Sequence, residues 1–357
     1  MNPPTSAAVS TRYRGELPER LRLAPGRAVL WRSATCLQLG VEPHRAMVLD
    51  ALPEPLATLL RRMDGVRRTP DLLAEAEAAG APPGSGQVML AELHRAGLVQ
   101  DAAPAEGGPT GWHRIALAAE AAQWSVHTTR SPRDVLRRRR EAMVHVVGSG
   151  RVAAALTAAL AAGGVGQVTV HATGAVSASD LGTGLLPDDL GRPRAAAMRD
   201  VALRAAPQVR VSACRPPDLV VLTDVVVPEP AVVSGLLADR APHLLAYAHE
   251  GAAAVGPLVW PGRSSCLRCA ELHRADLDEA WPKLAAQLVG RTAASDLATT
   301  LLAAALAAEQ AFAALAGPGA GRPVPAAWGA TLELDPAGAS LRRRPRPPHP
   351  RCHCGAR

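Results

Sequence analysis

The sequence is poor in aromatic residues and almost without lysine. Aromatic residues make up 3% of the 357 residues, and of the 39 basic residues only Lys283 is a lysine. Proteins that bind single-stranded nucleic acid interleave basic and aromatic side chains, because bases stack on the aromatic rings. That pattern is missing here, so the net charge of +7 does not predict a nucleic-acid partner. Any mechanism that needs a lysine has one candidate.

The sequence also lacks an export signal and an uninterrupted apolar segment. Residues 1–14 contain no apolar core of the kind that a signal peptide needs. The longest apolar run, 297–315, includes Glu309 and Gln310 and predicts a buried or amphipathic helix. We therefore expect a cytoplasmic protein with no membrane partner. In the cytoplasm, six cysteines indicate metal binding or chemistry before disulfide bonds.

Composition and periodicity divide the chain into four segments. Residues 1–19 are predicted to be disordered. Residues 20–105 contain three short alternating strands followed by helices over 53–62, 69–80 and 85–97, an α+β order typical of a small winged-helix module. Residues 106–140 form a linker and a connecting helix. Residues 141–357 form the second domain.

The second domain opens with a strand, a glycine turn, a helix and a second strand. The strand over 143–147 runs into Gly148-Ser149-Gly150, and the next strand, 167–171, ends at His171. This is a βαβ unit, so we predict an α/β fold with a Rossmann-like parallel sheet. Glycines at this turn let an anion approach the helix N-terminus, but a tight turn alone also requires them, and both interpretations stay open. Two features disfavour a nucleotide: no carboxylate ends the second strand to hold a ribose, and only Arg192 and Arg194 could replace a phosphate-binding lysine.

Four cysteines form two close pairs near the end of the chain. Cys266 and Cys269 make a Cys-x-x-Cys pair, and Cys352 and Cys354 a Cys-x-Cys pair. Two thiolate pairs complete a tetrahedral site of the kind that holds structural zinc. The second pair disfavours a redox function for the first, as does our expectation that the first pair does not begin a helix. The tight Cys-x-Cys spacing leaves open that His353 replaces one thiol.

Residues 143–354 resemble the ubiquitin-activating-enzyme-like (ThiF/MoeB) superfamily. The resemblance is carried by VVGSGRVA, AAGGVGQVTV, DLGRPR, DLVVLTD, GPLVWPGRSSCLRC and the closing CHC. Residues 256–281 are most similar to the ThiF-like partners of cyclodehydratases in thiazole/oxazole-modified peptide (TOMM) biosynthesis, a bacteriocin-type pathway. The N-terminal module resembles PqqD-like domains, which bind the leader segment of precursor peptides.

The resemblance implies roles for particular residues. Gly148 and Gly150 match the nucleotide loop, Asp224 matches the aspartate that positions magnesium and ATP, and Arg194 stands where active members have lysine. The ribose carboxylate is absent, and 180–190 contain no counterpart of the arginine segment that contacts the γ-phosphate. No cysteine lies between Cys269 and Cys352 for a thioester step.

These observations favour a zinc-containing, homodimeric scaffold that binds a leader peptide and presents it to a cyclodehydratase. The alternative is a working ATP- and magnesium-dependent adenylyltransferase that activates a protein or peptide C-terminus through Asp224 and Arg194. A third hypothesis is a winged-helix DNA-binding regulator. It is disfavoured because His94 and Arg95 are the only basic residues of 87–97, too few to neutralise phosphates.

Overall fold

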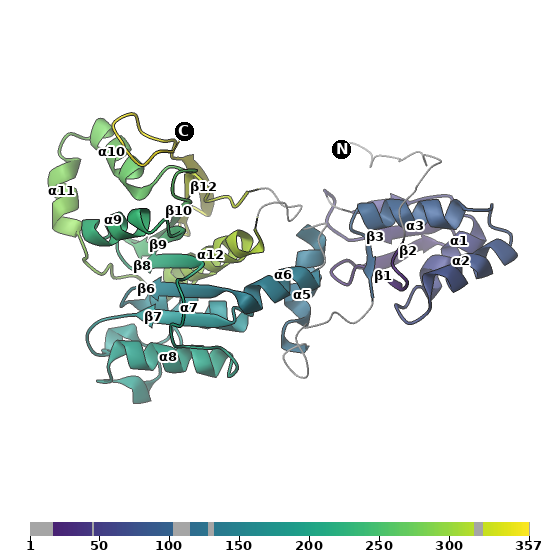
Figure 1. The fold of residues 1–357 in the computed structure, drawn as a ribbon, viewed down its shortest axis with the longest axis horizontal. Helices are drawn as coiled ribbons and strands as arrows, with labels where there is room; N and C mark the ends of the chain where they lie inside the picture. The colour runs from purple at the N-terminus through teal and green to yellow at the C-terminus, as the bar shows by residue number, and fades with distance from the viewer. Residues whose placement is uncertain (1–16, 45, 103–114, 128–131, 318–323, 357) are drawn as a thin grey trace. The chain divides into compact units, whose positions relative to one another are not determined.

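The computed structural model describes residues 17–44, 46–102, 115–127, 132–317 and 324–356, which fall into two compact units that divide after Arg137 (Figure 1). The disorder predicted for 1–16 and the linker predicted from residue 106 to 114 lie outside these residues. Each unit is described by itself below.

The first unit has the predicted order of strands and then helices. Its three-stranded antiparallel sheet has the order β2-β3-β4, and the predicted first strand pairs instead with the last, as β1 with β5. Leucines of strands and helices, among them Leu37, Leu39, Leu60 and Leu90, close one apolar core. The elements are β1 (Leu21–Leu23), β2 (Val29–Ser33), β3 (Cys36–Leu39), β4 (Met47–Leu49), α1 (Glu54–Arg62), α2 (Thr69–Ala78), α3 (Ser85–Arg95), β5 (Val99–Asp101) and α5 (Ala118–His127), followed by α6 (Pro132–Glu141), whose last residues belong to the second unit.

The second unit is built on a seven-stranded sheet of order β12-β11-β10-β9-β8-β6-β7. Strands β7, β6, β8 and β9 are parallel, and β10, β11 and β12 continue the sheet antiparallel, which confirms the predicted α/β class. The elements are β6 (Met143–Val147), α7 (Arg151–Ala162), β7 (Gln167–His171), η1 (Ala178–Asp180), η2 (Pro187–Asp189), α8 (Arg194–Ala205), β8 (Leu219–Thr223), α9 (Pro230–Ala238), β9 (His243–His249), β10 (Ala252–Val259), α10 (Leu267–Leu277), α11 (Trp281–Leu288), α12 (Leu297–Ala316), β11 (Ala330–Asp335) and β12 (Ser340–Pro345).

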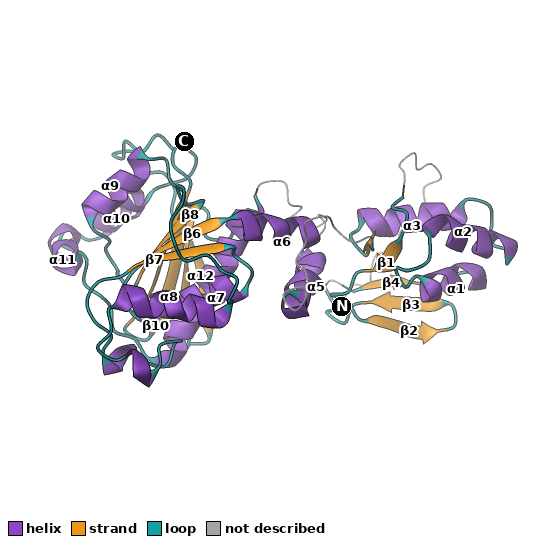
Figure 2. Cartoon of the chain, turned by 60° about the horizontal axis from the view of Figure 1, so that its bottom comes forward, coloured by secondary structure: helices purple, strands orange, loops and turns teal. Residues whose placement is uncertain are grey.

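Helices cover both faces of this sheet (Figure 2). Val221 of β8 packs with residues of α7, α8 and α12, whereas its neighbours Val220 and Leu222 pack with residues of α9 and α10. Such alternation is what a strand buried on both faces requires. The helix α12 is long and apolar enough to cross a membrane by length and composition, but its alanines lie in the core against α7, β9 and β10. It is therefore a core helix, as predicted.

The sheet register brings the candidate site together. Val147, the last residue of β6, lies opposite Leu222 of β8. The glycine turn after β6 and Asp224 after β8 therefore meet at the carboxyl edge of the parallel strands, where ligands of open α/β sheets bind.

Candidate functional site

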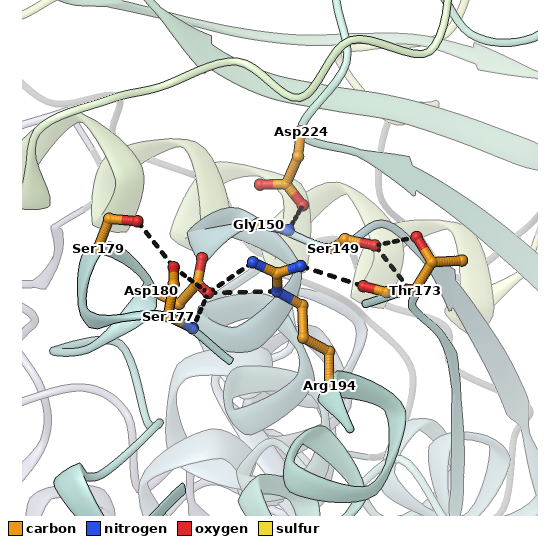
Figure 3. A network of polar contacts seen from close by, with 8 residues as sticks. All are labelled: Ser149, Gly150, Thr173, Ser177, Ser179, Asp180, Arg194 and Asp224. Atoms are coloured by element: carbon orange, nitrogen blue, oxygen red, sulfur yellow. Dashed lines mark hydrogen bonds and ion pairs between the residues drawn. The ribbon is translucent and has the colours of Figure 1, made fainter. Parts of the chain in front are cut away.

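Asp224 closes the N-terminus of α7 (Figure 3). Its carboxylate accepts hydrogen bonds from the amides of Gly150 at 3.0 Å, Val152 at 2.9 Å and Ala153 at 3.2 Å, and from the Thr223 hydroxyl at 2.8 Å. The residue is 2% exposed and has a left-handed φ of 64°, which aims the side chain at the helix. Burial raises the pKa of the Asp224 carboxyl, while the Thr223 hydroxyl and the three amides oppose that shift. The carboxylate thus occupies the place at which a helix N-terminus would bind a phosphate.

The two glycines of the turn are explained by this aspartate. A Cβ atom at Gly148 would overlap the Thr223 hydroxyl, and one at Gly150 would collide with the Asp224 carboxylate. Both glycines have to lack a side chain for β8 to bring Asp224 onto α7. In this arrangement the glycine turn accommodates the protein's own carboxylate.

Arg194, the predicted substitute for a phosphate-binding lysine, is already paired. Its guanidinium donates to Asp180 through Nη2 at 2.8 Å and Nε at 3.2 Å, and to the Thr173 carbonyl through Nη1 at 3.1 Å (Figure 3). Burial alone would raise the pKa of Asp180, but the Ser177 amide and Arg194 lower it below its ordinary value. Arg192 is likewise held, by Asp189 and Asp200. Neither arginine offers a free charge to a triphosphate.

Arg151, which the sequence analysis did not single out, crosses the same site. It is the first residue of α7, and its guanidinium donates to the Ser295 carbonyl at 3.3 Å and to the Leu181 carbonyl at 2.8 Å. The side chain therefore joins the segments on two sides of the pocket. The one available signal in the sequence was a bulky basic residue directly after the second glycine of the turn.

Three of the four predicted nucleotide-site residues meet in one pocket, and Gly148 is not part of its lining. Gly150, Arg194 and Asp224 line a space of about 460 Å³ together with Ser149 and Arg151. The residues present do not fit an ATP–magnesium complex in this arrangement, because the helix N-terminus is filled and the arginines are paired. The end of β7 supplies His171 where a ribose-binding carboxylate would stand.

The four predicted metal ligands form a compact cluster. The Sγ atom of Cys266 lies 3.8 Å from that of Cys269 and 3.6 Å from that of Cys352. The Sγ atoms of Cys269 and Cys354 are 3.6 Å apart. Zinc held by four thiolates at about 2.3 Å requires sulfur–sulfur edges of about 3.8 Å, so the donor set fits Zn²⁺. Among the residues that the structure describes, the cluster consists of these four thiols, and His353 is not one of its members.

The helix α10 begins at this cluster, contrary to our expectation. Cys266 is its N-cap residue, so the Cys-x-x-Cys pair does lie at a helix N-terminus. Burial raises the pKa of the Cys266 thiol, and it also raises the pKa of Cys352 to about 11. In Cys354, hydrogen bonds with the Ala356 amide and the neighbouring thiols outweigh burial and lower the pKa of that thiol. The second pair, in contact with the first, distinguishes this cluster from a thioredoxin-like redox site.

A second polar group ties the C-terminal segment to α10. His349, which is buried, lies with Nε2 2.6 Å from Asp276, and its Nδ1 accepts from the Arg351 amide at 3.1 Å. His273 contacts the Pro347 carbonyl at 3.0 Å. Both ring nitrogens of His349 are hydrogen-bonded, and its contact with Asp276 ties the segment of Cys352 and Cys354 to α10. The ligand atoms of His273, Asp276 and His349 also lie close enough together to hold a metal ion.

Comparisons with known proteins identify the family and the fold of this chain. The model of the ThiF family matches residues 125–356. Crystal structures of E. coli MccB with MccA-N7isoASN (14% identity, TM-score 0.71) and with ATP (15% identity, TM-score 0.70) each cover 94% of this chain and are covered over 99% of their own. The structure of PaaA (16% identity, TM-score 0.68) covers 90% of this chain, with 98% of its own length matched. At these identities the likeness shows the fold. No curated protein matches the sequence.

Proposed function

Because this chain belongs to the ThiF family, we propose that it is a non-catalytic scaffold that binds a precursor peptide for modification by a partner enzyme. The observation that carries the proposal is the Asp224 carboxylate on the N-terminus of α7. The carboxylate that the resemblance assigns to magnesium and ATP is bonded here to the amides of Gly150, Val152 and Ala153. The Asp224 side chain thereby fills the N-terminus of α7. The Arg151 side chain crosses the same pocket and bonds to the Ser295 and Leu181 carbonyls.

The binding function is assigned to the first unit. Its β2 is an edge strand among the described residues, and its Val29 and Leu30 side chains are each 41% exposed. The Gly40 amide donates to the Ala28 carbonyl at 2.8 Å, so the antiparallel alternation directs the Val29 amide and carbonyl away from β3. An extended leader segment can add to this edge as a further strand, with Val29 and Leu30 supplying apolar contact.

The remaining parts of the proposal follow from the sequence resemblance. The modification is of the thiazole/oxazole type, the partner is a cyclodehydratase, and the scaffold is a cytoplasmic homodimer whose C-terminal segment is held by zinc. E. coli MccB, which shares the fold, is described as a microcin C7 biosynthetic enzyme and has been solved in complex with N-formylated MccA. That likeness supports a role in peptide biosynthesis for this chain.

Fluorescence anisotropy with a labelled leader peptide, encoded near the gene for this chain, tests the proposal. Residues 1–105 should bind the leader and residues 141–357 should not. In the full chain, Val29→Pro removes an outward amide and should weaken binding about tenfold or more, whereas the control Val29→Thr keeps the amide and should bind as the parent does. If residues 141–357 bind as tightly as the full chain, the assignment to the first unit is wrong.

A working adenylyltransferase is the competing function. Gly150, Arg194 and Asp224 do line one pocket, as that function would need. It requires Asp224 to leave α7 and Arg194 to leave Asp180 when ATP binds. Titration with ATP and magnesium separates the two functions.

A further inference from the structure

Three arginines of the second unit converge on one pocket without a carboxylate partner. Arg240 follows α9, Arg263 lies in the turn before Cys266, and Arg268 is on the first turn of α10. All three are exposed, and among the described residues none of them makes an ion pair or side-chain hydrogen bond. They line a pocket of about 750 Å³ whose wall also includes three of the four clustered thiols, and the lining contains no aspartate or glutamate.

Among the described residues, three unpaired arginines converge at this pocket, whereas unpaired arginines such as Arg199 and Arg210 lie outside it. Other arginines of the second unit, such as Arg192, Arg204 and Arg215, are each paired with an aspartate. A zinc ion on four thiolates carries two negative charges in total, fewer than the three guanidinium charges around the pocket. The pocket therefore stays positive when the zinc site is filled, and an anionic partner would gain ion pairs there without displacing existing ones.

A second, apolar pocket continues from the first. It measures about 380 Å³ and lies between α9 and α10, with Val233 on one side, Leu267 on the other and Leu245 of β9 beneath. Leu237 and Arg268 line both pockets. The two pockets thus form one groove that is mainly apolar at one end and basic at the other. The apolar end also contains Glu271, whose carboxylate is already paired with Arg274.

From this juxtaposition we infer that the groove between α9 and α10 docks an acidic polypeptide segment that inserts an apolar side chain. The apolar pocket has room for one large aliphatic or aromatic side chain, and the arginines lie next to it to pair with neighbouring carboxylates. A free phosphate or a nucleic acid would use the arginines but leave the apolar pocket empty. Such a segment belongs to a partner that the second unit recruits. The groove does not involve the β2 edge, so it goes beyond leader binding and can succeed or fail independently.

Fluorescence anisotropy on the zinc-loaded full chain tests this inference. The probe is a fluorescein-labelled peptide with a central leucine flanked on each side by two acidic residues. The triple variant Arg240→Gln/Arg263→Gln/Arg268→Gln should bind the probe about tenfold more weakly, the size expected for three partly exposed ion pairs. Replacing the leucine of the probe by serine should weaken binding to the parent chain, and high salt should weaken it further.

Two further variants distinguish the groove from a general charge effect. The triple variant Arg199→Gln/Arg210→Gln/Arg342→Gln removes the same charge from exposed positions outside both pockets and should bind as the parent does. Ser234→Trp fills the apolar pocket from an exposed position on α9 and should abolish the dependence on leucine. Equal losses in both arginine triples, or no saturable binding of the probe by the parent chain, would overturn the inference. A single-stranded oligonucleotide that competes as well as the acidic probe would overturn the assignment to a polypeptide.

Discussion

Replacing Asp224 by glycine should open the N-terminus of α7 and make it respond to anions. The change leaves the amides of Gly150, Val152 and Ala153 without the acceptor that they share. Loss of an N-cap costs about 1–2 kcal/mol, and loss of a buried negative charge at a helix N-terminus adds up to about 2 kcal/mol. Glycine adopts the φ of 64° freely, so backbone strain does not contribute. We therefore expect the first turn of α7 to lose about 3 kcal/mol.

Hydrogen exchange of the α7 amides measures this change locally, which avoids assuming two-state unfolding of a two-unit chain. A loss of about 3 kcal/mol corresponds to exchange about a hundredfold faster at Val152 and Ala153. Inorganic phosphate at millimolar concentration should restore protection in Asp224→Gly, because the vacated helix end binds anions. Asp224→Asn keeps one acceptor oxygen and should lie between the two. If the parent chain itself gains protection from phosphate, the helix end is not filled and the reasoning fails.

Three further predictions concern the zinc site, the Asp180–Arg194 pair and the glycine turn. Elemental analysis of the purified chain should find one zinc ion, which Cys266→Ser/Cys352→Ser should lose and Cys214→Ser, outside the cluster, should keep. The C-terminal segment of the double variant should also be cleaved faster by protease. Zinc retained in the double variant would contradict the site. Because the Ser177 amide and Arg194 lower the pKa of Asp180 in the folded chain, Asp180→Asn should be about 1 kcal/mol less stable than the parent at pH 7. This stabilisation is complete above the unfolded pKa and is lost as the pH falls from about 4 through the lowered folded pKa, so the difference in stability should narrow steadily in acid denaturation. A difference that does not narrow below about pH 4 would refute the ion-pair account. Gly150→Ala should be strongly destabilised, because the added Cβ collides with the Asp224 carboxylate. In thermal unfolding, a second change, Asp224→Gly, should restore part of the lost stability. Additive losses in the double variant would show that the two residues are not coupled.

The sequence predicted the elements whose signals are local. Apolar runs predict strands over 143–147, 167–171 and 219–223, and β6, β7 and β8 have these bounds. The run 209–213 also predicts a strand, because apolar and polar residues alternate in it, but it forms an isolated bridge between Arg210 and Gln167. Backbone hydrogen bonds of Arg210 with Gly166 and Val168 hold it beside β7, and among the described residues no second strand pairs with it. Strand β12 was missed because residues 342–344 are arginines, and their strand character comes from pairing with β11, not from hydrophobic alternation.

The sequence indicated which residues belong to the candidate site but not which of them contact one another. The glycine motif identified Gly148 and Gly150, and the resemblance to the ThiF/MoeB superfamily identified Asp224 and the position of Arg194. The pocket at the carboxyl edge of the sheet brings Gly150, Arg194 and Asp224 together. Nothing in the sequence states that Asp224 caps α7, because this contact joins residues more than seventy positions apart and depends on the register of β6 against β8. The hydrogen bonds from Arg151 to the Ser295 and Leu181 carbonyls were missed for the same reason. The four thiols were predictable because paired cysteines carry their chemistry in their spacing.

Isothermal titration calorimetry of the zinc-loaded full chain with ATP and magnesium tests the central claim most directly. The account predicts no saturable heat at millimolar ATP, because Asp224 fills the phosphate position and Asp180 holds Arg194. Binding in the micromolar range that disappears in Asp224→Asn would contradict it and identify the chain as a nucleotide-using member of the ThiF family.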